Sequence, residues 1–193
     1  MKNKETLVFM IVALVIGILV GVIAVNLMGR KEQRAPMGPP PGTSGSMVNV
    51  QQNIQVLEDL VAKDPGNRNA WVELGNTYFD SDMPMKAVEA YGKALELNGK
   101  DPNVLTDQGI MFRQLGWYDR AIENFRKANE IDPRHSPSLF NLGLVYRENL
   151  NDDPHAIEAW EKFLALNPTG QSADYVRNQL ELLRSHPPAP KAQ

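Results

Sequence analysis

The sequence contains no cysteine and only three histidines among 193 residues. Without thiols, the chain has no disulfide, no thiolate metal ligand, no cysteine nucleophile and no lipid-modified cysteine. The three histidines, His135, His155 and His186, are scattered, which argues against a metal site built on imidazole ligands. A glycine-rich phosphate loop and a nucleophile–base pair are also missing from the sequence. We therefore expect a protein that is not an enzyme and that has no cofactor.

The larger part of the chain also lacks a basic region. From Val48 to His186 it has 14 Lys and Arg against 21 Asp and Glu, a net charge of 14 − 21 = −7. Proteins that bind nucleic acids need a positive footprint for the phosphates. The charge balance therefore predicts that nucleic acid is not a partner.

Apolar residues are concentrated near the N-terminus, directly after the short tail of residues 1–6. Between Leu7 and Met28, 19 of 22 residues are apolar. At 1.5 Å per residue, such a helix is long enough to cross a hydrocarbon core of about 30 Å. It is longer than the apolar stretch of a secretory signal, about 7–15 residues. We therefore predict an uncleaved transmembrane helix at residues 7–28.

Two features of this segment bear on its surroundings. Basic residues flank it almost equally, with Lys2 and Lys4 before it and three more after it, so the positive-inside rule does not decide its orientation. Small residues recur every four positions, a spacing that lets two membrane helices approach closely. These candidate packing residues for a homo-oligomer are Ala13, Gly17 and Gly21.

Residues 29–47 are predicted to be a linker that is first basic and then rich in proline and glycine. Ala35–Ser46 has four prolines and three glycines, a composition that favours extended or flexible chain. The linker is interpreted as a tether between the membrane helix and the rest of the chain. A second proline-rich stretch, residues 187–193, is predicted to be a disordered tail.

The body of the chain repeats itself. Gly75, Gly109 and Gly143 are each 34 residues apart. The first unit reads Trp71-x2-Leu74-Gly75-x2-Tyr78, followed by Ala87-x3-Tyr91. This pattern and its period resemble the tetratricopeptide repeat. Two departures occur: Gln108 replaces the Leu before Gly109, and the third unit has one extra residue, assigned to the turn at residues 149–153.

The resemblance implies an all-α fold. We expect a single transmembrane helix plus an α-solenoid of three tetratricopeptide units, each made of an A helix and a B helix, with capping helices at both ends. The predicted segments are a capping helix at 48–67, the first, second and third units at 68–101, 102–135 and 136–169, and a second capping helix at 170–186.

Local chemistry supports these helices independently. The repeated glycines let each A helix lie close to its B helix, where aromatic residues fill the space. Asp or Ser before Pro predicts helix starts at Asp101, Ser136 and Asp153. In the first capping helix, the residues predicted to share one buried face are Ile54, Leu57, Leu60 and Val61.

The resemblance also implies that certain A-helix positions line a groove that binds a protein or peptide. Mapped onto this chain, the candidate groove residues are Asn69, Val72, Asn76, Phe79, Thr106, Ile110, Arg113, Phe140, Leu144 and Arg147; Asn103 and Pro137 occupy the two remaining positions. In this hypothesis Asn76 pairs with a peptide backbone, and Arg113 or Arg147 pairs with a carboxylate. The alternative is that these residues are solvated or pack against neighbouring helices.

One specific binding function is excluded. Tetratricopeptide repeats that hold chaperone C-termini use a clamp of Lys, Arg and Asn around two carboxylates. The equivalent positions here are Val72, Asn76, Asp107, Pro137 and Asn141. Because none of them is Lys or Arg, we do not expect this clamp.

The remaining charged residues have simple interpretations. The pairs Asp80/Asp82 and Asp152/Asp153 could suggest a cation site, but both lie in turns between helices, and we favour helix capping. Glu residues on the B helices are followed by Lys four positions later, which predicts surface ion pairs. These pairs are Glu89–Lys93, Glu123–Lys127 and Glu158–Lys162.

A narrower resemblance concerns function. The run Leu57–Leu60 leading into Asp64-Pro65-Gly66-Asn67 and then Ala70-Trp71 is similar to the tetratricopeptide subunit of bacterial cytochrome c haem lyase. That resemblance implies a single-pass protein of the bacterial cytoplasmic membrane, with a periplasmic repeat domain that delivers apocytochrome c during cytochrome c maturation. More broadly, we expect a membrane-anchored adaptor that assembles envelope complexes. The alternative is a self-associating structural scaffold of a membrane complex.

Overall fold

The computed structural model describes residues 43–185, with side chains from residue 49 onward. The chain divides into two units, Met1–Gly45 and Ser46–Gln193. The predicted membrane helix, its packing residues Ala13, Gly17 and Gly21, and the tail at 187–193 lie outside the described residues. Within residues 43–185, no helix is both long enough and apolar enough to span a membrane.

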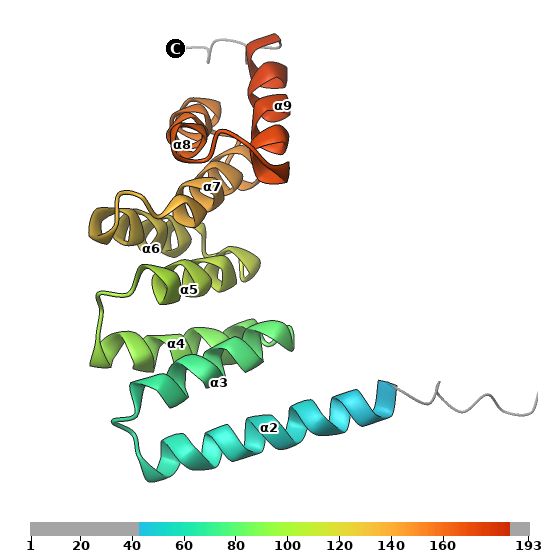
Figure 1. Ribbon diagram of the computed structural model, residues 1–193, viewed down its shortest axis with the longest axis vertical. Coiled ribbons are helices and arrows are strands. Elements are labelled where there is room, and N and C mark those ends of the chain that lie inside the picture. The colour runs from blue at the N-terminus through green and yellow to red at the C-terminus, as the bar shows by residue number, and fades with distance from the viewer. Residues whose placement is uncertain (1–42, 186–193) are drawn as a thin grey trace, which may run out of the picture. The chain divides into compact units, whose positions relative to one another are not determined.

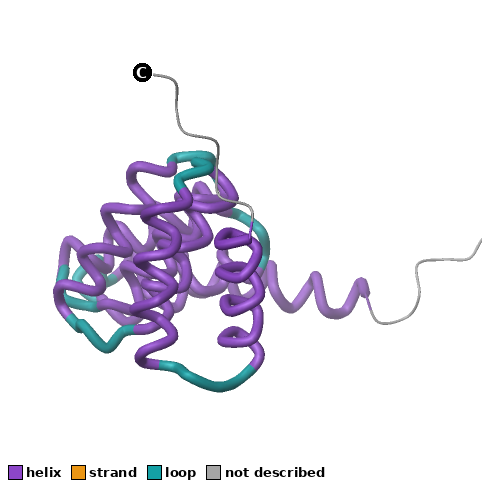
Figure 2. The backbone as a smooth tube through the Cα atoms, turned by 90° about the horizontal axis from the view of Figure 1, so that it is seen from above, coloured by secondary structure: helices purple, strands orange, loops and turns teal. Residues whose placement is uncertain are grey.

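The described part of the chain is entirely helical, without a strand (Figure 2). From residue 68 onward, consecutive helices pack against each other in chain order (Figure 1). This confirms the all-α repeat architecture. The helices are α2 (Thr43–Lys63), α3 (Arg68–Asp80), α4 (Pro84–Leu97), α5 (Pro102–Gln114), α6 (Tyr118–Ile131), α7 (Ser136–Leu144) with its π-helical continuation η2 (Val145–Asn149), α8 (Asp153–Leu166) and α9 (Gln171–Ser185).

Each predicted repeat is a helix pair. The A helices are α3, α5 and α7, and the B helices are α4, α6 and α8. On each B helix an aromatic ring lies directly against the A-helix glycine of the same repeat, so that a Cβ atom on the glycine would overlap the ring. The three contacts are Gly75–Tyr91, Gly109–Phe125 and Gly143–Trp160. The prediction that glycine permits close helix approach is confirmed.

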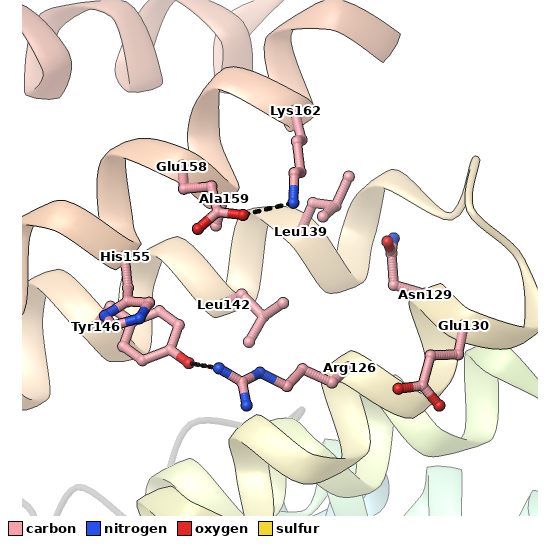
Figure 3. Close-up of a pocket in the computed structure, with 10 residues that line it drawn as sticks. All are labelled: Arg126, Asn129, Glu130, Leu139, Leu142, Tyr146, His155, Glu158, Ala159 and Lys162. Carbon is pink, nitrogen blue, oxygen red and sulfur yellow. Dashed lines mark hydrogen bonds and ion pairs between the residues drawn. The ribbon is translucent and has the colours of Figure 1, made fainter.

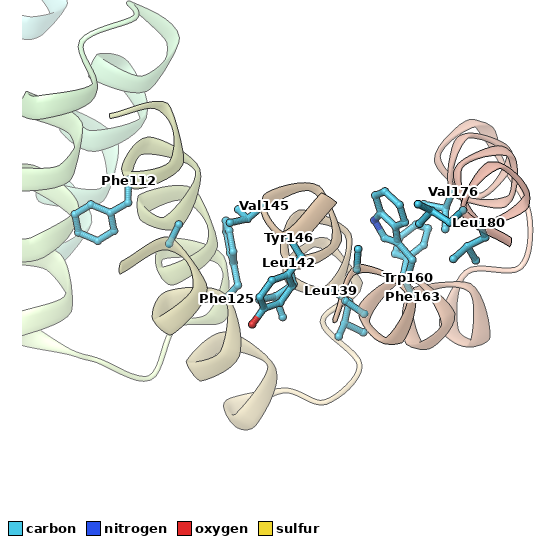
Figure 4. Packing of buried hydrophobic residues seen from close by; sticks show 14 residues of the cluster. Phe112, Phe125, Leu139, Leu142, Val145, Tyr146, Trp160, Phe163, Val176 and Leu180 are labelled. Carbon is cyan, nitrogen blue, oxygen red and sulfur yellow. The ribbon is translucent and has the colours of Figure 1, made fainter. Parts of the chain in front are cut away.

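Among the described residues, the core consists of two clusters that share Val88 and Ile110 at their edges. One cluster fills the space from α2 to α5, and the other extends from α5 to α9. Figure 4 shows the second cluster, with the Trp160 indole between α7 and α9. Because the core is distributed between neighbouring helices, the array needs no single large centre.

The helix caps agree with the prediction at one of three positions. Asp101 caps α5 by accepting hydrogen bonds from the Asn103 and Val104 backbone N–H groups. At the other two positions the predicted helix start is confirmed, but the predicted residue is not the cap. Ser136 and Asp153 are the first residues of α7 and α8, and the caps are His135 and Asp152.

The extra residue of the third repeat lies inside a helix rather than in the turn after it. The backbone has positive φ at Asp82, Gly116 and Asn151, which close the three A helices at equivalent places. The preceding helix contains one more residue in the third repeat, and its last turn widens into the π-helical segment η2. The insertion is therefore absorbed before Asn151.

Both predicted capping helices form, but α2 differs from the prediction in its length and in its packing. Helix α2 begins at Thr43, so residues 43–47, predicted to be linker, are helical. The last proline before them is Pro41, so each of these residues has the backbone N–H group that proline lacks. Leu60, predicted to be buried, is 40% exposed, and Val56 is 64% exposed. In α4 and α6 the equivalent face packs against the A helix of the same repeat, and no described helix takes that place beside α2.

Candidate functional site

The candidate groove residues lie on α3, α5, α7 and η2, and we call their accessible side the A-helix face. Asn69 and Asn76 are exposed, and seven others are partly exposed. Those seven are Val72, Phe79, Ile110, Arg113, Phe140, Leu144 and Arg147. The accessible residues thus share a face composed of A-helix side chains.

Thr106 is a correction to the predicted set. It is only 3% exposed. Its hydroxyl donates to the Pro102 carbonyl at 2.7 Å and lies 3.5 Å from His135 Nδ1. Because the segment leading into α7 covers this part of α5, Thr106 supports the packing of two repeats and does not face a ligand.

The two arginines are also engaged internally. Arg113 donates from Nε to Asn149 and from Nη2 to Glu148, at 2.8 and 2.7 Å. Arg147 donates to Asp153 at 2.8 Å, and the Asp153 side chain is 10% exposed. Both arginines therefore already pair with carboxylates of the chain itself. This counts against their predicted role, which was to pair with a carboxylate of the ligand.

Asn76 is held in a defined orientation. The buried Tyr91 ring lies against Gly75, and its hydroxyl donates to Asn76 Oδ1 at 2.8 Å. With its oxygen occupied, the Asn76 side chain presents its NH₂ group to a bound backbone carbonyl. The geometry is therefore compatible with the predicted backbone contact, and Tyr91 is the residue that the sequence reasoning left out.

Asp107 is the most unusual charged residue of this face. It is partly buried in the middle of α5, and no hydrogen bond or ion pair joins it to the residues that the structure describes. Burial, followed by the charges of Asp101 and Asp80, raises its pKa to about 6. The sequence analysis considered Asp107 only as a clamp position. A carboxylate in a helix centre was the available signal, but its burial could not be read from the sequence.

Asp107→Asn is expected to stabilise the protein above pH 7. A carboxyl whose pKa is raised on folding binds its proton more tightly in the folded state, so its ionised form lowers stability above about pH 6. The expected gain is about 1 kcal/mol after allowance for solvent screening. The gain should disappear as the pH falls from 6 to below 3.8, the ordinary value for Asp.

Urea unfolding of the full chain at several pH values measures this effect. Glu123→Gln, an equivalent change at an exposed position on α6, is the control. Its unfolding free energy should differ from that of wild type by nearly the same amount at every pH. A gain for Asp107→Asn that is the same at pH 4 and pH 8 would contradict the account.

A second candidate site lies between the B helices. A cavity of about 240 Å³ opens between α6, α7 and α8, over an apolar floor of Leu139, Leu142 and Ala159 (Figure 3). Its polar groups are largely paired: Arg126 donates to the Tyr146 hydroxyl, and Lys162 donates to Glu158 at 2.7 Å. The Arg126 guanidinium keeps its charge, because the acceptor of its hydrogen bond is a neutral hydroxyl.

The space between a B helix and the next helix pair, where this cavity lies, has counterparts elsewhere in the array. Between α2, α3 and α4 it is a cavity of about 480 Å³, in which Glu58 replaces Arg126 as the partner of the tyrosine hydroxyl. In the middle repeat the position is filled, because Asn124 donates to Gln108 Oε1 at 2.8 Å and Gln108 donates to the Val88 carbonyl. The departure of Gln108 from the repeat pattern is therefore a packing feature.

The remaining predictions concern surface charges. Asp152 caps α8 by accepting from the His155 backbone N–H, as predicted, whereas Asp153 pairs with Arg147 and Asp82 accepts from Gln114. The pair Glu158–Lys162 forms. Lys93 instead pairs with Glu96, three residues away, so the predicted Glu89–Lys93 pair is wrong.

Comparison with known proteins identifies the repeats. Residues 69–101 and 103–135 match the family model of the tetratricopeptide repeat. The third helix pair, 136–169, lies outside these matches but has the same arrangement of helices. Residues 69–101 and 103–135 are therefore tetratricopeptide repeats.

Two curated relatives illustrate how far the similarity extends. The small glutamine-rich tetratricopeptide repeat-containing protein 2 of Mycosarcoma maydis is 33% identical over 85 residues, which cover 44% of this chain and 24% of the relative. Hsp70-Hsp90 organizing protein 2 of Arabidopsis thaliana is 24% identical over 131 residues, covering 68% and 23%. The chain thus spans about a quarter of each relative.

Solved structures share the fold. A crystal structure of MamA protein has a TM-score of 0.64 at 22% identity and covers 74% of this chain and 80% of MamA. PilF of Pseudomonas aeruginosa has a TM-score of 0.58 at 23% identity, covering 72% and 65%. At this identity the likeness shows the arrangement of helices alone.

Proposed function

We propose that this chain, whose residues 69–101 and 103–135 are tetratricopeptide repeats, is an adaptor that binds a protein or peptide partner on the A-helix face. The observation that supports this best is the combination of an oriented amide, Asn76, with partly exposed apolar residues such as Val72, Phe79 and Ile110. Apolar contacts supply binding energy, and a fixed amide gives direction to an extended backbone. No described group of residues suits catalysis.

Anchoring in a membrane is a separate part of the proposal and rests on the composition of residues 7–28. We place the protein in the bacterial cytoplasmic membrane with the repeats on the periplasmic side, where the adaptor would serve the assembly of envelope complexes. Delivery of apocytochrome c is the most specific form of this function, and only the narrower sequence resemblance supports it. A reporter that is active only outside the cytoplasm, fused after Gln193, tests the topology; an inactive fusion would refute the periplasmic placement.

The binding function is tested by blocking the A-helix face. Asn76 and Lys127 are both exposed. Asn76 lies on α3, and Lys127 lies on the side of α6 that also carries Ile122 and Glu123, which we call the outer side of α6. The full chain, purified from its native cells, should lose its partner with Asn76→Trp and retain it with Lys127→Trp. Equal retention by both variants, or loss with Lys127→Trp alone, would refute binding on the A-helix face.

Self-association is a second candidate function, favoured by the exposed face of α2. Val56 and Leu60 are 64% and 40% exposed, whereas the outer side of α9 is mostly polar. This asymmetry suits a closed pairing of two α2 helices rather than an open chain of copies. A scaffold of this kind should assemble with increasing concentration, and Val56→Glu should prevent assembly.

A further inference from the structure

We infer that the partner taken by the A-helix face carries a lysine or arginine side chain beside an apolar residue, with Asp107 and Asp80 receiving the cation. This inference rests on the proposed function and names the chemistry of the partner. Three observations support it: where the two carboxylates lie, what the nearby cations do, and what surrounds them.

The two carboxylates lie on α3 and α5, two A helices that contact each other. Tyr91 donates to Asn76 at 2.8 Å, and the charges of Asp107 and Asp80, after burial, raise the pKa of this tyrosine. Asp80 is the last residue of α3 and Asp107 lies in α5, so the two neighbouring A helices bring their carboxylates toward Asn76. Asn76, Asp80 and Asp107 therefore lie on the same pair of neighbouring A helices.

Neither carboxylate has a positive partner within the described residues. The arginines of this side of the molecule pair elsewhere: Arg68 with Asp101, Arg113 with Glu148, and Arg147 with Asp153. The interaction of Asp80 with its own helix is unfavourable, because a helix C-terminus has partial negative charge. Asp107 is desolvated beside other acids.

Asp107 thus lowers the stability of the free protein, and a bound cation would remove that penalty. A carboxylate that is perturbed by burial in this way is found more often at binding sites than on inert surface.

The surroundings favour an organic cation over a metal ion. No three potential metal ligands in the described region are close enough to share an ion. Val72, Phe79 and Ile110 are partly exposed apolar neighbours on the same two helices. Lysine and arginine have long apolar stems that pack on such residues while the charged end reaches a carboxylate. A basic and apolar segment therefore complements this surface in both respects.

The test uses three fluorescent peptides of equal length that share one pattern of leucine and valine. Their remaining positions are lysine, glutamine or glutamate. Binding to the full chain in detergent micelles is followed by fluorescence anisotropy at low salt. We expect the lysine peptide to bind most tightly and the glutamate peptide most weakly.

Asp107→Asn should weaken binding of the lysine peptide about tenfold, because a charge-assisted hydrogen bond becomes a neutral one. The variant is expected to be more stable than wild type, so unfolding would not explain the loss. Glu123→Gln, on the outer side of α6, is the matched control and should leave affinity unchanged. Asp80→Asn should weaken the same peptide.

The outcomes separate the two proposals. If the glutamine or glutamate peptide binds as tightly as the lysine peptide, or if Asp107→Asn has no effect, the cationic partner is refuted while binding on the A-helix face can still hold. If no peptide binds but Asn76→Trp releases the native partner, the cationic partner is again refuted and the adaptor function stands. If Asn76→Trp also leaves the native partner bound, both are refuted.

Discussion

Gly143→Ala is expected to destabilise the protein by about 2–3 kcal/mol, the upper range for overpacking a core. A methyl group at this position would overlap the indole of Trp160, which is fully buried between α7, α8 and α9. The ring cannot move aside easily, because its Nε1 donates to the Phe140 carbonyl and neighbouring side chains surround it. The overlap should outweigh the gain in helix propensity, about 1 kcal/mol for Gly to Ala.

Gly92→Ala provides the matched control. Gly92 lies inside α4, and a Cβ atom there would meet only Gln108 Nε2, at an ordinary contact distance of 3.5 Å. The same substitution should therefore stabilise by about 0.5–1 kcal/mol through helix propensity alone. Thermal and urea unfolding of both variants measure the difference. If both substitutions shift stability in the same direction, the claim that the repeat glycine is needed for close approach of the Trp160 ring is refuted.

Asp101→Ala is expected to cost about 2–3 kcal/mol, since it removes a helix cap and a charge partner together. Asp101 caps α5 through two backbone N–H groups and also accepts from Arg68 of the preceding repeat. The Arg68 side chain is only 24% exposed, and its buried Nε already lacks a partner within the described structure. Without Asp101, the covered guanidinium would also lose its charge partner. The same residue therefore starts one repeat and ties it to the previous one.

Asp101→Asn separates the two roles. Asn is as good a cap as Asp, so only the ion pair is lost, and the expected cost is about 1 kcal/mol. Burial would raise the pKa of Asp101, but the hydrogen bond from Arg68, the backbone N–H groups and the arginine charge outweigh it and lower this pKa.

The ionised Asp101 therefore adds stability above pH 3.8, and that stability is lost as the pH falls through its lowered pKa. The difference between wild type and Asp101→Asn should narrow below pH 3.8, as measured by urea unfolding. A difference that persists unchanged to low pH would show that the ion pair contributes nothing.

Much of the fold could be predicted because single residues have steric consequences that repeat. A glycine every 34 residues, followed by an aromatic residue at a constant distance, is sufficient to pair Gly75 with Tyr91 and Gly109 with Phe125. The features that escaped prediction depend on neighbours in space. Leu60 is exposed because no described A helix precedes α2, and the extra residue of the third repeat lies in η2 because helix widening there keeps Asn151 in place.

The candidate site was less predictable than the fold, for a physical reason. Repeat position indicates which face a side chain occupies, and it placed Asn76 and Ile110 correctly on accessible surface. It does not indicate whether a charge is already satisfied. Arg113 and Arg147 are paired by acids from a neighbouring segment, whereas Asp107 lacks such a partner among the described residues. The electrostatic character of the face, acidic rather than basic, emerges only when the helices are assembled.

The central claim is that the A-helix face binds the partner, and crosslinking from two matched isoleucines tests it most directly. Ile110 lies on this face and Ile122 on the outer side of α6; both are partly exposed. A photoreactive amino acid is placed at one or the other position of the full chain in its native cells. The account predicts that Ile110 captures the partner that Asn76→Trp releases and that Ile122 does not. Capture from Ile122 with none from Ile110 would contradict the account.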